Sequence, residues 1–191
     1  MKRISEVTMA KNILFIVGSL RVRSFNRQLA QKAAELVRAQ ADVSFLEWAD
    51  VPLFSQDAES PVPPPVARVR KEVQTADGIW IFSPEYNGTV PGTLKNLLDW
   101  LSRSLVSGDF SSGTAVAGKT VTVSGVGGKS ATRSVRADLQ KLLAFMRMRV
   151  VCGEGTGYAA DAEAFRTDKL TLTEENIALL ASQAAEFLAA V

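Results

Sequence analysis

Short apolar runs alternate along the chain with longer segments of helical periodicity. The runs cover residues 12–17, 43–46, 78–83, 119–124 and 149–152. Continuous apolar character over so few residues is typical of strands that are buried on both faces. Each run is followed, directly or after a loop, by a segment in which apolar positions recur three and four residues apart. That spacing predicts amphipathic helices.

Five helices are predicted, each with one apolar stripe. In chain order the stripes are Leu29, Ala33, Leu36 and Val37; Val66, Val69, Val73 and Ala76; Leu94, Leu97, Leu98 and Leu101; Val135, Leu139, Leu142, Leu143 and Met146; and Ile177, Leu180, Ala184, Phe187 and Leu188. Strict alternation of strand and helix favours one parallel sheet with helices on both faces. With five strands, the expected fold is the flavodoxin-like three-layer α/β sandwich with strand order 2-1-3-4-5.

The remaining segments are expected to be irregular. Residues 47–63 are rich in Pro, Asp and Ser, and residues 153–170 show neither period. Residues 102–118 form a loop that is too long for a bare connection, which indicates a role in function or subunit contact. With no repeat or linker in view, we expect a single domain over residues 1–191 that begins with a polar leader, residues 1–10.

Composition narrows the functional classes. The 191 residues are 47% apolar and 22% charged with a net charge of +2, which excludes a disordered or collagen-like chain. This balance gives no reason to expect nucleic acid or a membrane as partner, and no stretch approaches the roughly 20 apolar residues of a membrane span. Because Cys152 is the only cysteine, no intramolecular disulfide can form, and we expect a reducing, cytoplasmic location.

Histidine is absent from the sequence. Its absence excludes Ser-His-Asp hydrolysis, Cys-His proteolysis and histidine-ligated metals, and we predict no metal site. Cys152 has no second cysteine that could resolve an oxidised thiol, so we interpret it as a small apolar residue at the end of an edge strand. Any chemistry must therefore run without imidazole.

Candidate binding residues follow strands one, three and four, because ligands of such sheets bind beyond the carboxyl ends of the strands. The first loop, residues 18–26, leads into a helix N-terminus, which favours an anion. Ser19, Arg21, Ser24 and Asn26 add hydroxyl, guanidinium and amide donors that suit a phosphate, and the loop contains no acid. Capping of the helix by Ser24 or Asn26 is the structural alternative.

Two further loops complete the candidate site. Residues 84–92 (PEYNGTVPG) contain two prolines and two glycines, which fix an irregular backbone, and Tyr86 offers a flat aromatic face. Residues 124–128 (SGVGG) let the backbone approach a flat, bulky group, although they also suit a plain turn. Together the three loops predict a ligand with a phosphate at one end and a flat ring at the other.

The segments GSLRVRSFN (18–26) and SPEYNGTVPGTLKNLLDW (83–100) resemble the NADPH-dependent FMN reductase family. That family includes flavodoxin-like quinone, azo-dye and chromate reductases. The resemblance covers roughly residues 11–190 in element order. It supports the predicted fold and supplies an expected cofactor, FMN.

The resemblance carries over to individual positions. It implies that the FMN phosphate is held by Ser19, Arg21, Ser24 and Asn26. It implies that the isoalloxazine ring is flanked by Pro84, Glu85, Tyr86 and Asn87, and that its other side is closed by Ser124, Gly125 and Gly128. The third loop departs from the family, which often has a longer version that contains serine and proline.

The resemblance also implies an activity. FMN would pass a hydride from NADPH or NADH to a small-molecule acceptor, such as a quinone, a flavin, an azo dye or a metal oxyanion, and no catalytic side chain is required. It further implies a homodimer or homotetramer, with residues 95–105 as interface candidates. A flavodoxin-type electron carrier and a flavin-binding regulatory protein with little turnover stay open. The slightly basic chain and the arginine of the first loop disfavour the carrier.

Overall fold

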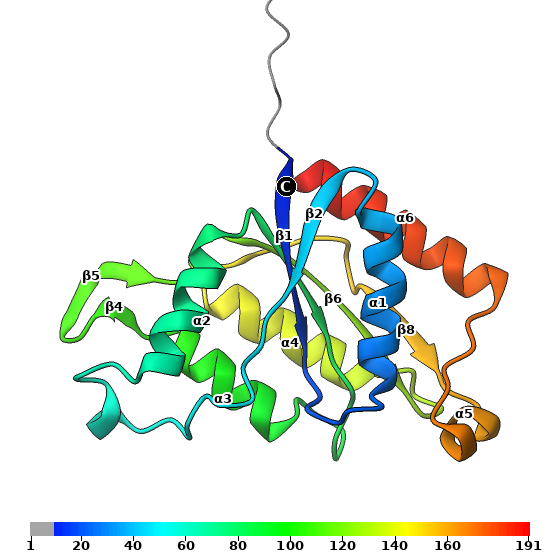
Figure 1. Cartoon of the computed structure of the whole chain (residues 1–191), viewed down its shortest axis with the longest axis horizontal. Helices are drawn as coiled ribbons and strands as arrows, with labels where there is room; N and C mark the ends of the chain where they lie inside the picture. The colour runs from blue at the N-terminus through cyan, green and yellow to red at the C-terminus, as the bar shows by residue number, and fades with distance from the viewer. Residues whose placement is uncertain (1–9) are drawn as a thin grey trace, which may run out of the picture.

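The structure is a computed structural model that describes residues 10–191. Its centre is a parallel sheet in the order β2-β1-β3-β6, with the fifth position shared by β7 and β8. The strands are β1 (Lys11–Val17), β2 (Ala41–Phe45), β3 (Gly78–Phe82), β6 (Thr120–Gly127), β7 (Arg149–Val150) and β8 (Thr156–Ala159). The predicted strand order 2-1-3-4-5 is therefore confirmed, with two short strands in the last position. The carboxyl ends of the strands meet at the lower edge of Figure 1.

Helices cover both faces of the sheet and give three layers (Figure 1). On one face lie α1 (Phe25–Val37) and α6 (Glu174–Ala190), and on the other lie α2 (Pro64–Thr75), α3 (Gly92–Leu101) and α4 (Arg133–Phe145). Alternate residues of β1 enter the two cores, Leu14 and Ile16 on the α3 side and Phe15 on the α1 side. A strand buried on both faces needs consecutive apolar residues, which explains the runs in the sequence.

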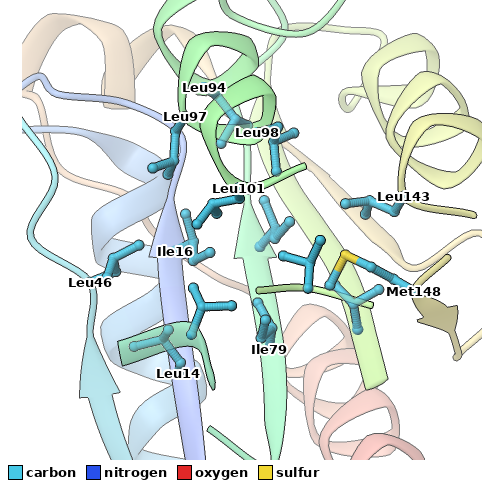
Figure 2. Close-up of a cluster of buried hydrophobic side chains, with 14 of the residues drawn as sticks. Leu14, Ile16, Leu46, Ile79, Leu94, Leu97, Leu98, Leu101, Leu143 and Met148 are labelled. Carbon is cyan, nitrogen blue, oxygen red and sulfur yellow. The ribbon is translucent and has the colours of Figure 1, made fainter. Parts of the chain in front are cut away.

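Figure 2 shows the core beneath α3. The inner leucines of this helix, Leu94 and Leu97 among them, lie over Leu14 and Ile16 of β1 and Ile79 of β3, and all five side chains are almost fully buried. Burying each such side chain contributes about 1.5–3 kcal/mol. This packing fixes the ends of β1 and β3, and so fixes the bases of the two loops that leave them.

Residues 102–118 are not a loop, contrary to the expectation from sequence. They contain an antiparallel hairpin, β4 (Ser104–Val106) and β5 (Asp109–Thr114), which projects at the side of α2 (Figure 1). Its strands are mostly exposed and rich in small polar residues, so they lack the apolar run by which buried strands are recognised.

The fifth strand is interrupted, where the sequence predicts a continuous one over residues 149–152. Cys152, Gly153 and Gly155 have φ of 64°, 52° and 65°, which breaks the extended backbone between β7 and β8. Arg136 of α4 holds this turn, since its Nη1 donates to the carbonyls of residues 154 and 155 at 2.8 and 3.0 Å. Burial lowers the pKa of Arg136 from its ordinary value.

Two other boundaries differ from the prediction. β6 continues to Gly127 rather than ending at residue 124, because β8 pairs with it from Ser124 onward. Residues 153–170, expected to be irregular, contain β8 and the short helix α5 (Ala162–Thr167). By contrast, residues 47–63 hold only the 3₁₀ turn η1 (Gln56–Ala58).

The predicted polar leader lies outside the described residues apart from Ala10. Within residues 10–191, no helix has both the length and the apolar character needed to cross a bilayer. Across the same residues, no three potential metal-binding side chains are grouped.

Candidate functional site

One cavity of about 190 Å³ lies where the loops after β1, β3 and β6 meet. Its wall consists of Ser19, Arg21, Ser24, Phe25, Asn26, Pro84, Glu85, Tyr86, Val126, Gly127, Gly128 and Phe165. The structure thus brings together most of the residues that the sequence analysis selected from three separate segments. Asn87, Ser124 and Gly125 are not part of this wall.

Hydroxyl groups mark one end of the cavity. Ser24 is the N-cap of α1, and its Oγ accepts from the N–H groups of Asn26 and Arg27 at 3.2 and 3.4 Å. The capping interpretation is therefore confirmed for Ser24. Ser19 is also buried, and its Oγ accepts from the N–H of Arg21 at 3.4 Å. Because both hydroxyls accept in these contacts, each keeps a proton that it can donate to a ligand.

Arg21 supplies positive charge at the same end. Its guanidinium lies 5.7 Å from the ring centre of Phe25 and forms an ion pair with Asp168. The side chain of Arg21 is 48% exposed, so part of the guanidinium faces solvent at the mouth of the cavity. The partner acid, which the sequence analysis did not select, comes from the segment after α5.

Asn26 joins the first and third loops. Its Nδ2 donates to the carbonyl of Val126 at 3.0 Å, and its Oδ1 accepts from the N–H of Val126 at 2.9 Å. Both ends of the amide are therefore satisfied by the backbone of β6. Asn26 lines the cavity but acts by fixing the distance between the two loops.

Glu85 joins the second loop to α4. Its Oε2 accepts from the N–H of Val135 in the first turn of α4, and its Oε1 accepts from the hydroxyl of Ser130, both at 3.1 Å. A carboxylate at a helix N-terminus satisfies a free N–H group and interacts favourably with the helix dipole. Glu85 therefore fixes the second loop in place rather than presenting a free acid to the cavity.

The tip of the second loop is a tight turn. Tyr86 and Thr89 exchange backbone hydrogen bonds of 3.1 Å across Asn87 and Gly88, whose φ values are 52° and 78°. Positive φ at both central residues explains the Asn-Gly pair. Asn87 is not part of the cavity wall, whereas Tyr86 lies on it with 49% of its surface exposed.

Ser124 and Gly125 belong to the core behind the cavity. The hydroxyl of Ser124 accepts from Trp80 Nε1 at 3.0 Å and donates to Gln183 Oε1 at 2.8 Å. A Cβ on Gly125 would come within 2.3 Å of the carbonyl oxygen of Ser83. This glycine lets β6 pack against the end of β3, and its role here is in packing rather than in the cavity wall.

Four wall residues were not selected from the sequence. Phe25, Val126 and Gly127 lie inside the loops that were chosen, so their position alone could have found them. Phe165 comes from α5, in a segment that shows no periodic signal. Its ring packs edge-on against Phe25 with ring centres 5.4 Å apart, and no sequence pattern predicts that contact.

The wall chemistry fits FMN. Two serine hydroxyls and a guanidinium at one end suit a phosphate. The other end combines the ring of Tyr86 with Pro84, Val126 and the backbone of Gly128, where an added Cβ would meet nothing within 4 Å. That end suits a flat, largely apolar group. The fold and site thus define a flavodoxin-like α/β protein with a phosphate-and-ring site at the carboxyl edge of its sheet.

Comparison with known proteins gives the family. The family model described as NADPH-dependent FMN reductase matches residues 11–161. A quinone reductase of Pseudomonas putida is 36% identical over 129 residues, which cover 67% of this chain and 69% of that protein. The chain therefore belongs to the NADPH-dependent FMN reductase family, as the motifs of the first two loops indicated.

Two further similarities are informative. A 2-hydroxy-1,4-benzoquinone reductase of a Burkholderia species is 44% identical over 95 residues, which cover 50% of this chain and 52% of that protein. The match therefore spans about half the length of that relative. The solved structure of FerB, a flavoenzyme NAD(P)H:(acceptor) oxidoreductase from Paracoccus denitrificans, has a TM-score of 0.82 at 24% identity and is covered over 96% of its length, with 94% of this chain. This second similarity concerns the fold.

Proposed function

We propose that this protein is an FMN-dependent NAD(P)H oxidoreductase. The observation that carries the proposal is that one cavity is lined both by the phosphate-type donors of the first loop and by the aromatic and glycine residues of the second and third loops. When bound, FMN accepts a hydride from a nicotinamide and passes the electrons to an acceptor. Family membership supports the same cofactor.

In this proposal the protein binds and orients the cofactor. Ser19, Ser24 and Arg21 hold the phosphate by hydroxyl and guanidinium donors. The wall of Tyr86 and Gly128 receives the ring, and the pairing of Asn26 with Val126 sets the spacing between these two ends. Asn26 ties the first loop to β6, and Glu85 ties the second loop to α4, so the site is preorganised for the ligand.

No side chain of the wall needs to act as an acid or base. Glu85 is the only carboxylate among the wall residues, and both of its oxygens accept hydrogen bonds from the protein. The reaction therefore depends on position and on access to the cavity. This agrees with a chain that lacks histidine.

We propose a quinone as the acceptor class. Relatives named quinone reductase and 2-hydroxy-1,4-benzoquinone reductase support it. A free flavin, an azo dye and a metal oxyanion are the competing acceptors that the test must include. NADPH and NADH are compared in the same assay. Only NADPH carries a 2′-phosphate, and Arg23 and Arg103 are the candidates for contact with it. In the structure both arginines contact an acid, but the side chain of Arg103 is 30% exposed and that of Arg23 is 76% exposed, so Arg23 is the more available of the two.

The proposal is tested with purified protein. We expect a visible flavin spectrum, either as isolated or after addition of FMN, and release of FMN on acid treatment. Oxidation of NADPH or NADH should then require a quinone. An electron carrier would bind FMN but oxidise neither nicotinamide, and a protein that binds no flavin would contradict the proposal at its base.

We also propose a homodimer or homotetramer in a reducing, cytoplasmic compartment. The sequence-based interface, residues 95–105, is less accessible than expected, because Trp100 and Leu101 are fully buried within their own chain. Leu20 and Leu53 are exposed and line a hollow together with Asn96 of α3, and they support this face as a subunit contact. Light scattering of the purified protein measures the assembly directly.

A further inference from the structure

Asp168 is the acid that contacts the phosphate end of the cavity. One carboxylate oxygen pairs with Arg21, and the other lies 3.4 Å from Nη1 of Arg23. Both arginines belong to the first loop, which is 140 residues or more away in sequence. Asp168 thus ties the C-terminal part of the chain to the loop proposed to hold the FMN phosphate.

We call residues 161–170 the α5 segment. Apart from its first residue, Asp161, it lies beyond residues 11–161, the part of the chain that matches the family model. It also supplies a wall residue, because Phe165 lines the cavity and packs against Phe25. The proposed cofactor site therefore includes a wall that comes from outside the matched part of the chain.

The α5 segment is fastened at both ends. Directly before it, the N–H of Ala160 donates to the carbonyl of Gly127 at 2.8 Å, and at its start Asp161 caps α5. At its end, Gln28 of α1 donates to the carbonyl of Asp168 at 2.9 Å and accepts from the N–H of Leu170 at 2.8 Å. These two hydrogen bonds hold the backbone at Asp168, and the contacts with Arg21 and Arg23 orient its carboxylate.

A fixed acid changes what Arg21 can do. A free arginine side chain on a surface loop samples many rotamers, and ordering it on binding costs free energy. Asp168 is 22% exposed and occupies one terminal nitrogen of Arg21. The other guanidinium nitrogens remain available as donors. The three side chains together carry a net charge of +1, so the end of the cavity still attracts an anion.

We propose that Asp168 is a positioning residue for recognition of the FMN phosphate, acting through Arg21. By holding the guanidinium at the mouth of the cavity before the ligand arrives, it reduces the ordering cost of binding. This inference rests on the proposed function, because it assumes that FMN is the ligand. If Asp168 acts in this way, the α5 segment contributes to the selectivity for FMN over riboflavin, which is the same flavin without the phosphate.

The test compares FMN and riboflavin binding to the wild type and to Asp168→Asn. Asparagine suits the backbone at this position, because φ is 59° and Asn tolerates the left-handed region well. The expected result is about a tenfold weaker FMN dissociation constant with no change for riboflavin. In an Arg21→Ala background, Asp168→Asn should leave FMN binding unchanged, because the acid acts through that arginine.

Glu163→Gln is the matched control. It removes one negative charge from the same short helix, where Glu163 pairs with Arg166 on an exposed surface. FMN binding by this variant should equal that of the wild type.

Three results would overturn the inference. FMN binding that is unchanged or tighter in Asp168→Asn would show that the acid does not assist, or competes with, the phosphate. Equal weakening of FMN and riboflavin would show a structural role only. A wild-type protein that binds neither flavin would contradict the proposed function itself, which distinguishes that failure from the other two.

Discussion

The side-chain amide of Asn26 and the backbone of Val126 exchange two hydrogen bonds, 3.0 and 2.9 Å long, across 100 residues of sequence. This pair joins the start of α1 to the end of β6. It places the phosphate-type donors of one loop at a fixed distance from the glycine-rich wall of another. Because the amide is buried, neither bond can be replaced easily by water.

Asn26→Ala should therefore reduce both stability and FMN binding. The substitution leaves the buried N–H and carbonyl of Val126 without partners, which costs about 2–4 kcal/mol in the free energy of unfolding. Urea denaturation measures this change. Asn12→Ala is the control, since the amide of Asn12 makes only an exposed contact of 3.5 Å. Equal effects of the two variants would contradict the role of the Asn26 pair.

Arg21→Ala should weaken FMN binding by about 1–3 kcal/mol, because it removes a charge-assisted contact with the phosphate. Flavin fluorescence titration at fixed ionic strength gives the dissociation constant. Arg38→Ala provides the comparison, because Arg38 lies at the opposite end of α1. An unchanged FMN dissociation constant in Arg21→Ala would remove Arg21 from the site.

Gly125→Ala and Gly128→Ala should separate packing from ligand contact. A Cβ at Gly125 would lie 2.3 Å from the Ser83 carbonyl oxygen and 2.5 Å from Thr132 Oγ1, so we expect a loss of stability of about 1–3 kcal/mol. A Cβ at Gly128 would meet nothing within 4 Å of the protein. Its variant should keep wild-type stability and weaken FMN binding by about 1–2 kcal/mol, because the methyl group enters the cavity.

Thermal unfolding without flavin measures the stability of the two variants, and FMN titration then measures their affinity for the cofactor. If Gly128→Ala bound FMN as the wild type does, the ring would not lie against this wall.

Glu85→Gln should leave the pH dependence of flavin reduction unchanged. Its carboxylate caps α4 and is not a free acid, so the substitution should lower the free energy of unfolding by about 1 kcal/mol. Anaerobic reduction of the bound flavin, followed over a range of pH, tests this. Loss of one limb of the pH profile would instead show that Glu85 transfers a proton.

Cys152 should be an unreactive thiol. Burial raises the pKa of Cys152, and its Sγ donates to the carbonyl of Gln183 at 3.7 Å. Because the folded-state pKa lies above that of the unfolded chain, stability decreases as the pH rises from the unfolded-state value to the folded-state value. The raised pKa also lowers the fraction of Cys152 that is thiolate, so alkylation of native protein should be slower than that of unfolded protein at every pH in this window. Cys152→Ala should keep full flavin reduction.

Much of this architecture is predictable because buried parallel strands leave continuous apolar runs. β1 and β3 are of this kind, and the loops that follow them carry the motifs of the family. The interrupted fifth strand and the β4–β5 hairpin were missed, since one depends on positive φ at residues 152, 153 and 155 and the other is polar and exposed.

The site residues divide in the same way, into those that a sequence pattern reveals and those that only the folded chain brings together. Residues close together in sequence, such as Ser19, Arg21 and Ser24, could be selected as a donor cluster. The contacts that fix the site could not, because Asn26 with Val126 and Arg21 with Asp168 join segments that only tertiary folding brings together. Ser124 was predicted to end its strand and to begin the third loop, yet its hydroxyl lies in the core, where it donates to Gln183.

Anaerobic mixing of the FMN-loaded protein with NADPH, and separately with NADH, tests the central claim most directly. The account predicts that the absorbance of the bound flavin bleaches much faster than that of free FMN under the same conditions, and that a quinone restores it. A protein that binds FMN but whose flavin is reduced no faster than free FMN would contradict the account. That result would leave a flavin-binding protein without the proposed oxidoreductase activity.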